Sequence, residues 1–212
     1  MKVEHVVRQC GLSQGHLDAL ASAVPLGYRA LRDLVKTTPM LGQFQPGTTT
    51  VGYLRNLAVQ HALDAQAAST GLFYTEMAFN RPRNHSFLQL RIERVVITAH
   101  YSGATGTRAL RKAISRAELS QRNGDLFAQE ATEADADIER GQAYVQLRHG
   151  GVATPVFAAL YIPNRNQQSY LHEPMVLELA PPEGAQVEMV TDKLHEAIKR
   201  KVREDQRERD AG

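Results

Sequence analysis

The hydrophobic pattern of the chain changes its period near residue 71, and this change restricts the possible folds more than any other feature. Before residue 71, apolar residues recur every three or four positions, as they do along one face of a helix. After it, aromatic and β-branched residues alternate between two faces, as they do in strands. Helical spacing returns near the C-terminus. The sequence therefore predicts an α+β fold, with helices at both ends of a sheet.

We expect three helices within residues 1–70, which we assign to a helical N-terminal unit. Ser13 can cap the first helix, and Pro25 would end it or begin the next one. The second helix should end near Pro39, because the residue before a proline is pushed out of the helical region. The third and longest helix should begin at the threonines before residue 51 and end near Gly71.

The remaining residues, 71–212, form an α+β unit that we expect to pack with the first unit as one domain. Their pattern predicts a mainly antiparallel sheet of about five or six strands. The predicted strands are 72–79, 86–93, 94–101, 143–147, 156–162 and 175–179. One central helix is expected over 107–119. An amphipathic helix should end the chain, with an apolar stripe formed by Val187, Val190, Leu194, Ile198 and Val202.

Several function classes are disfavoured by what the sequence lacks. Cys10 is the only cysteine, which excludes an internal disulfide and a thiolate zinc site built from this chain alone. The chain has no Walker loop, no Gly-rich dinucleotide fingerprint and no H-E-x-x-H. It also has neither the apolar start of a signal peptide nor a run of roughly 18 apolar residues for a membrane span. We expect a soluble cytoplasmic protein with no metal, no cofactor and no membrane contact.

Positive charge is concentrated between residues 81 and 122. This segment balances to +7, whereas the whole chain carries a net charge of only +2. Such segregation indicates an anionic partner. The residues predicted to contact nucleic-acid phosphates are Arg81, Arg83, His85, Arg108, Arg111, Lys112 and Arg116. The alternative is a solvated face, or one neutralised by the acidic stretch 125–139.

Arg55 and His61 are separated by five residues in the third predicted helix, within the sequence RNLAVQH. This spacing resembles the signature of HEPN-type ribonucleases, in which an Arg and a His, usually paired across a helical dimer, cleave RNA without a metal. The resemblance implies that His61 moves a proton and that Arg55 stabilises the charge on phosphate. It also implies a homodimer. The alternative is a half-buried, hydrogen-bonded His61 on the apolar face of the helix.

A second group of polar residues is spread over the predicted strands and the loops beside them. Its members are His85, Arg91, His100, Tyr101, Arg148, His149, Tyr161, Arg165 and His172. Metal-independent ribonucleases built on small antiparallel sheets need this mixture of side chains, and we select His100 as a further acid or base. Neighbours along a strand point to opposite faces, so the sequence does not show which of them meet. Scattered polar residues on the solvent side of the sheet are the alternative.

Two functions follow from these patterns. The first is nucleic-acid binding, with RNA favoured as the partner and metal-independent ribonuclease activity as its enzymatic form. The second is a non-enzymatic protein-interaction module, which would regulate or neutralise a partner protein or act as an adaptor. In that case the narrow C-terminal stripe would be half of a dimer or partner interface.

Overall fold

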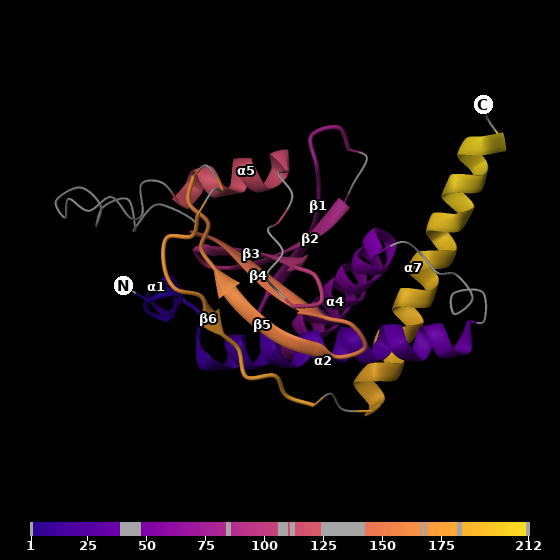
Figure 1. Cartoon of the computed structure of the whole chain (residues 1–212), viewed down its shortest axis with the longest axis horizontal. Coiled ribbons are helices and arrows are strands. Elements are labelled where there is room, and N and C mark those ends of the chain that lie inside the picture. Colours follow the sequence, from indigo (N-terminus) through magenta and orange to yellow (C-terminus); the bar gives the residue numbers. More distant parts are fainter. Residues whose placement is uncertain are drawn as a thin grey trace.

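The computed structural model describes residues 2–38, 48–83, 86–105, 110, 113–123, 143–165, 167, 169–181 and 184–210 (Figure 1). Its helices are α1 Val3–Gln9, α2 Gln14–Thr37, α4 Thr48–Thr70, α5 Ile114–Ser120 and α7 Gly184–Asp210. Its strands are β1 Tyr74–Phe79, β2 Ser86–Ile92, β3 Val95–Tyr101, β4 Ala143–Gly151, β5 Pro155–Tyr161 and β6 Met175–Val176. The predicted α+β class, with helices at both ends of a sheet, is confirmed.

The helices before the sheet are divided differently from our prediction. Ser13 does cap α2, since its side chain accepts a hydrogen bond from the backbone N–H of His16. The expected break at Pro25 is wrong, because α2 continues through the proline to Thr37. Val24 and Leu26 on either side of the proline are fully buried. Their burial favours a continuous helix even though the proline cannot donate a backbone hydrogen bond. The short helix α1 was not predicted.

The six strands form one sheet in the order β1-β2-β3-β4-β5-β6. All neighbours are antiparallel except β3 and β4, which are parallel. The mainly antiparallel sheet of about six strands is therefore confirmed. A parallel pair needs a crossover, and α5 lies within it. The central helix predicted over 107–119 is present only from Ile114, because Leu110 and Ala113 are not helical and 106–109 and 111–112 lie outside the described residues.

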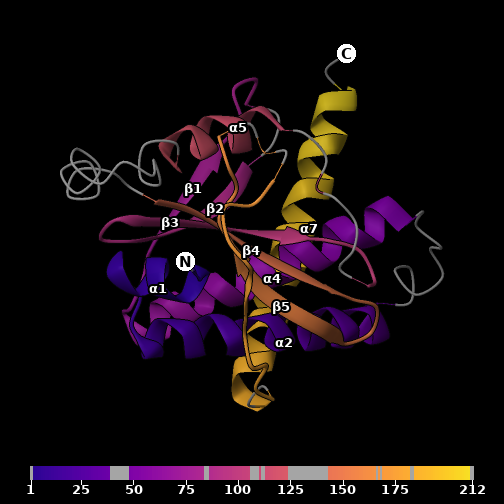
Figure 2. The same ribbon diagram turned by 60° about the vertical axis from the view of Figure 1, so that its left-hand side comes forward.

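The elements are arranged in layers around the sheet. Helices α2 and α4 cover one face, and α5 lies on the opposite face (Figures 1 and 2). The main core is built between the sheet and α2 and α4, and it includes Leu20, Val24, Ile97, Leu147 and Leu160. Helix α7 packs outside this layer, against α2 and α4. Within the described part of the chain, no helix combines the length and the apolar character needed to cross a membrane.

The apolar stripe of the C-terminal helix is used within the chain itself. Val187, Val190 and Leu194 are at most 4% exposed. Ile198 is partly buried and packs against the cluster that contains Leu194, whereas the side chain of Val202 lies outside the described residues. The first three positions of the proposed partner interface are therefore core positions, and a partner could contact them only if α7 moved.

Candidate functional site

The sheet face covered by α5, here called the α5 face, carries polar side chains inside otherwise apolar strands. Side chains alternate along each strand. Thr98 and His100 of β3 therefore share this face with Tyr144, Gln146 and Arg148 of β4, while the residues between them point into the main core. The parallel register pairs Thr98 with Gln146 and His100 with Arg148. The result is a compact polar cluster in the middle of the sheet.

His100 is the side chain of this cluster that could act as an acid or a base. Its Nε2 lies 2.6 Å from the Thr98 hydroxyl and 3.3 Å from the Tyr144 hydroxyl, and these two hydroxyls lie 2.8 Å apart. Burial, together with the nearby charges of Arg116 and Arg148 and electrostatic coupling to the His149 ring, lowers the pKa of His100 well below its usual 6.5. Burial also raises the pKa of Tyr144 to about 12. At neutral pH the site therefore holds a neutral imidazole beside a protonated phenol.

Arg148 is the most firmly held cation of the cluster, and it is only 5% exposed. Its Nε donates to the Ser102 hydroxyl at 2.8 Å, and its Nη1 donates to the Tyr170 hydroxyl, also at 2.8 Å. The guanidinium carbon lies 4.7 Å from the centre of the Tyr161 ring and 5.5 Å from that of Tyr170. Two aromatic rings and two hydroxyls thus fix the position of this charge.

Arg116 of α5 brings a second guanidinium to the same cluster. Burial lowers its pKa, and the nearby Tyr144 and Tyr170 oppose that shift. An Arg nevertheless stays charged in proteins. Its Nε is buried, and among the described residues it finds no hydrogen-bond acceptor. Buried donors are nearly always satisfied in folded proteins, so this atom marks a place where a ligand acceptor would be stabilising.

The chemistry of the α5 face therefore suits an oxyanion. Guanidinium groups present planar sets of N–H donors that match phosphate or carboxylate oxygens, and His100 can accept or donate a proton beside them. Over the described residues, no group of three or more His, Cys, Asp or Glu side chains could hold a metal ion.

A second polar group lies on the opposite face, between the sheet and the helices. His149 is fully buried, with Nδ1 3.2 Å from the Tyr28 hydroxyl and Nε2 3.3 Å from Asn56 Oδ1. Asn56 Oδ1 can only accept, so Nε2–H donates to it, and the unprotonated Nδ1 accepts a hydrogen bond from the Tyr28 hydroxyl. Burial and the charge of Arg55 lower the pKa of His149 to about 3. His149 is therefore a neutral structural contact between the sheet and the two helices.

His149 makes the stability of the protein depend on pH. Because His149 titrates near pH 3 when folded and near 6.5 when unfolded, the unfolded chain binds more protons between these values. Its contribution is complete above about pH 6.5 and is lost as the pH falls towards 3. In His149→Gln, whose amide can serve both hydrogen-bond partners, we expect a shallower fall in the free energy of unfolding over this range. Urea titrations at several pH values measure the free energy of unfolding of both proteins. The same dependence of this free energy on pH in the wild type and in His149→Gln would contradict the prediction.

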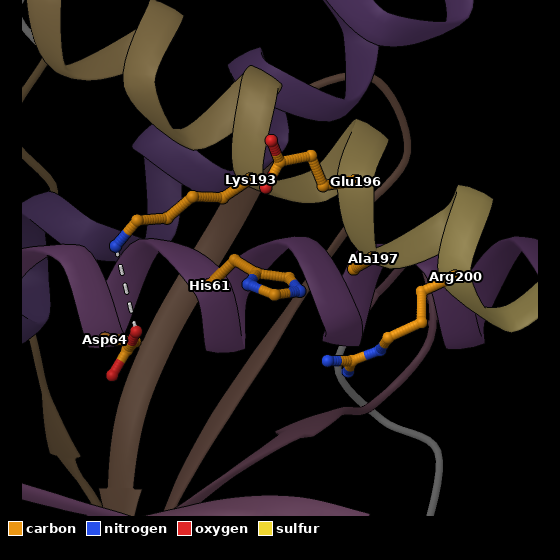
Figure 3. Close-up of a pocket in the computed structure, with 6 residues that line it drawn as sticks. All are labelled: His61, Asp64, Lys193, Glu196, Ala197 and Arg200. Carbon is orange, nitrogen blue, oxygen red and sulfur yellow. Dashed lines mark ion pairs between the residues drawn. The ribbon is translucent and has the colours of Figure 1, made fainter.

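The structure does not bring Arg55 and His61 together within one chain. Arg55 donates from Nε to the Val152 carbonyl at 2.8 Å and from Nη1 to the Tyr101 hydroxyl at 3.2 Å, so it joins α4 to the sheet. His61 instead faces α7, across a surface pocket of about 240 Å³. Figure 3 shows the residues that line it: His61, Asp64, Lys193, Glu196, Ala197 and Arg200. A HEPN-like pairing of this Arg and His would need a second chain.

The other predicted phosphate contacts are only partly described. Arg81 and Arg83 are exposed in the β1–β2 turn, which lies on the same side of the sheet as α5 (Figures 1 and 2). Arg91, which belongs to the polar group spread over the strands and not to the predicted phosphate contacts, also lies on the α5 face and pairs with Glu76 at 2.7 Å. The remaining members, His85, Arg108, Arg111 and Lys112, lie outside the described residues.

No family model, curated protein or solved structure matches this chain. Its function must therefore be inferred from its own geometry.

The residues that the sequence interpretation missed are the partners of the selected ones. Thr98, Ser102, Tyr144 and Tyr170 hold His100 and Arg148 in place, and none of them was selected. A signal for two of them was present, because polar residues occupy every second position of two apolar strands, at Thr98 and His100 and again from Tyr144 to Arg148. The sequence did not show the parallel register of β3 and β4, which brings these residues together.

Proposed function

We propose that this protein binds RNA through the α5 face, with a phosphate group held near His100, Arg116 and Arg148. The observation that carries the proposal is the buried Arg116 Nε, which lacks an acceptor among the described residues and lies close to a neutral His. An RNA phosphate supplies both the negative charge and the acceptor oxygens that such a group requires. The cytoplasmic location expected from the sequence is part of this proposal.

Aromatic residues beside the cluster support a single-stranded ligand. The rings of Tyr161 and Tyr170 lie 4.7 Å apart between centroids, and Tyr170 is 37% exposed. Exposed aromatic rings next to cations are the usual means of stacking unpaired bases. Arg81 and Arg83, on the same side of the sheet, would extend the positive surface along the strand of nucleic acid.

In the enzymatic form of the proposal, the cluster cleaves RNA without a metal. Neutral His100 takes the proton from the 2′-hydroxyl, whose oxygen forms a bond to phosphorus while the bond to the 5′-oxygen breaks. Water gives a proton to the leaving 5′-oxygen, and the hydroxide that remains takes the proton from His100, whose imidazole the buried Tyr144 holds through their hydrogen bond. Arg116 stabilises the charge that develops on the phosphate.

His100→Gln should then abolish cleavage of a labelled RNA and retain binding, whereas His61→Ala should retain both; the reverse pattern would move the acid–base role to His61.

RNA binding is tested by fluorescence anisotropy with labelled single-stranded RNA and duplex DNA across a range of salt concentrations. Arg116→Ala should weaken RNA binding about tenfold. It should also reduce by about 1 the steepness with which the logarithm of the binding constant falls with the logarithm of the salt concentration, because one phosphate contact is lost. The matched control is Arg29→Ala on α2, a 44% exposed cation on the other side of the sheet, which should change neither value. Absence of RNA binding at low salt, or equal effects of the two substitutions, would remove the proposal.

A second candidate function is protein binding through the end of α7. Figures 1 and 2 both show the last turns of this helix projecting beyond α2 and α4. A projecting helix end is available to a partner, including a second copy of the chain. Deletion of the residues after Arg200 should then change the assembly state measured by light scattering while the fold is retained. An unchanged assembly state would argue against this candidate.

A further inference from the structure

The pocket between α4 and α7 is a consequence of how the two helices pack. Leu194 of α7 is buried against Ala58 and Leu57 of α4 and holds the helices together. His61 lies one turn beyond Leu57, at the margin of this contact. Opposite it stands Ala197, whose small side chain leaves the space between the helices open (Figure 3). Ala197 is the one apolar residue of the described lining, and the other residues that line the pocket are polar or charged.

The walls carry charges of both signs around His61. Its titratable neighbours in the pocket are Asp64 on its own helix and Lys193, Glu196 and Arg200 on α7. Figure 3 shows the imidazole between the Lys193–Asp64 pair on one side and Arg200 on the other. Burial lowers the pKa of His61, Lys193 and Arg200 add to that effect, and Asp64 opposes it. An anion placed against the imidazole would therefore meet a cation on each side.

The two carboxylates of the lining balance its two cations by count, so the preference for an anion depends on where the charges lie. Asp64 already accepts a hydrogen bond from the Thr75 hydroxyl at 3.0 Å, and its other oxygen lies 3.9 Å from Lys193 Nζ. This ion pair is longer than a hydrogen bond, so Asp64 does not take up an N–H donor of the ammonium group. Glu196 is exposed at the rim, where its carboxylate can accept hydrogen bonds from ligand hydroxyls.

We propose that this pocket binds a small hydroxylated phosphate monoester. The phosphate would lie against His61, between Lys193 and Arg200, and the hydroxylated part would reach Glu196. The pocket volume of about 240 Å³ has room for more than a bare phosphate group. A bound dianion favours the protonated form of His61, so binding takes up a proton. This site is independent of the RNA-binding proposal, because it lies on α4 and α7 rather than on the α5 face.

Isothermal titration calorimetry with glucose 6-phosphate tests the proposal, with inorganic phosphate and glucose as comparison ligands. We expect glucose 6-phosphate to bind more tightly than phosphate and glucose not to bind. Repeating the titration in buffers with different ionisation enthalpies should show proton uptake in the wild type and a smaller uptake in His61→Gln.

Two variants examine the geometry of the site. Ala197→Leu fills the pocket without changing its charge, and Arg200→Ala removes one cation; each should weaken glucose 6-phosphate binding at least tenfold. Lys199→Ala is the matched control, because Lys199 is an exposed cation next to Arg200 that does not line the pocket. Circular dichroism confirms that each variant is folded. Absence of binding at millimolar ligand, or equal losses in Lys199→Ala and Arg200→Ala, would overturn the proposal.

Discussion

Replacing Asn123 with alanine is expected to lower the free energy of unfolding by about 4 kcal/mol, because it leaves three buried backbone groups without partners. Asn123 is fully buried. Its Nδ2 donates to the carbonyls of Tyr144 and Pro163, at 2.9 and 2.8 Å, and its Oδ1 accepts from the Tyr144 N–H at 2.7 Å. Each unsatisfied group costs about 1–3 kcal/mol, and no rearrangement of an alanine can replace them.

Urea unfolding of wild type and Asn123→Ala measures this loss. Gln121→Ala is a suitable control, since Gln121 belongs to the same short helical turn (Gln121–Asn123) but is exposed; it should change stability by less than about 0.5 kcal/mol. The Asn123 variant should also loosen Tyr144, which is hydrogen-bonded to His100. A loss below about 1 kcal/mol would show that water or a shifted backbone replaces the amide.

Replacing Leu194 with alanine is expected to cost about 2–5 kcal/mol, the usual range for a leucine truncated in a packed core. Leu194 is fully buried in a cluster with Leu31, Leu34 and Ala58, so α7 contacts both α2 and α4 through this side chain. A loss of this size would define the apolar stripe of α7 as part of the core of one chain.

The same variant separates the two interpretations of the C-terminal stripe. If Leu194 is a core residue, urea unfolding shows the loss and light scattering shows an unchanged assembly state. If the stripe is a partner interface, stability changes little and the assembly state changes. Met189→Ala is the control on the same helix, because Met189 is 41% exposed; it should change stability by less than about 0.5 kcal/mol.

The elements of the fold were predictable because each has a local cause in the sequence. The strand from Val95 to Tyr101 follows from a β-branched run, and the start of α2 follows from the cap at Ser13. The continuity of α2 through Pro25 was not predictable in this way, because it depends on burial against α4 and the sheet. Local propensity alone would have ended the helix there.

The candidate site was only partly predictable, for a different reason. His100 and Arg148 were both noticed in the sequence, but their proximity depends on the parallel register of β3 and β4. No local pattern specifies which strand pairs with which across a long connection. Arg55 and His61 show the opposite case, since they are close in sequence and yet reach different elements.

The parallel pairing of β3 and β4 also has a consequence for how the protein folds. Every neighbouring pair in the sheet joins consecutive strands, but the connection between β3 and β4, from 102 to 142, is much longer than any other; the next longest, between β5 and β6, runs from 162 to 174. Closing a longer loop costs more chain entropy, so local hairpins are favoured before it. His100 is on β3 and Arg148 is on β4, so these two residues come together only when the loop closes. We therefore expect the polar cluster of the α5 face to form late, after the local hairpins and helices.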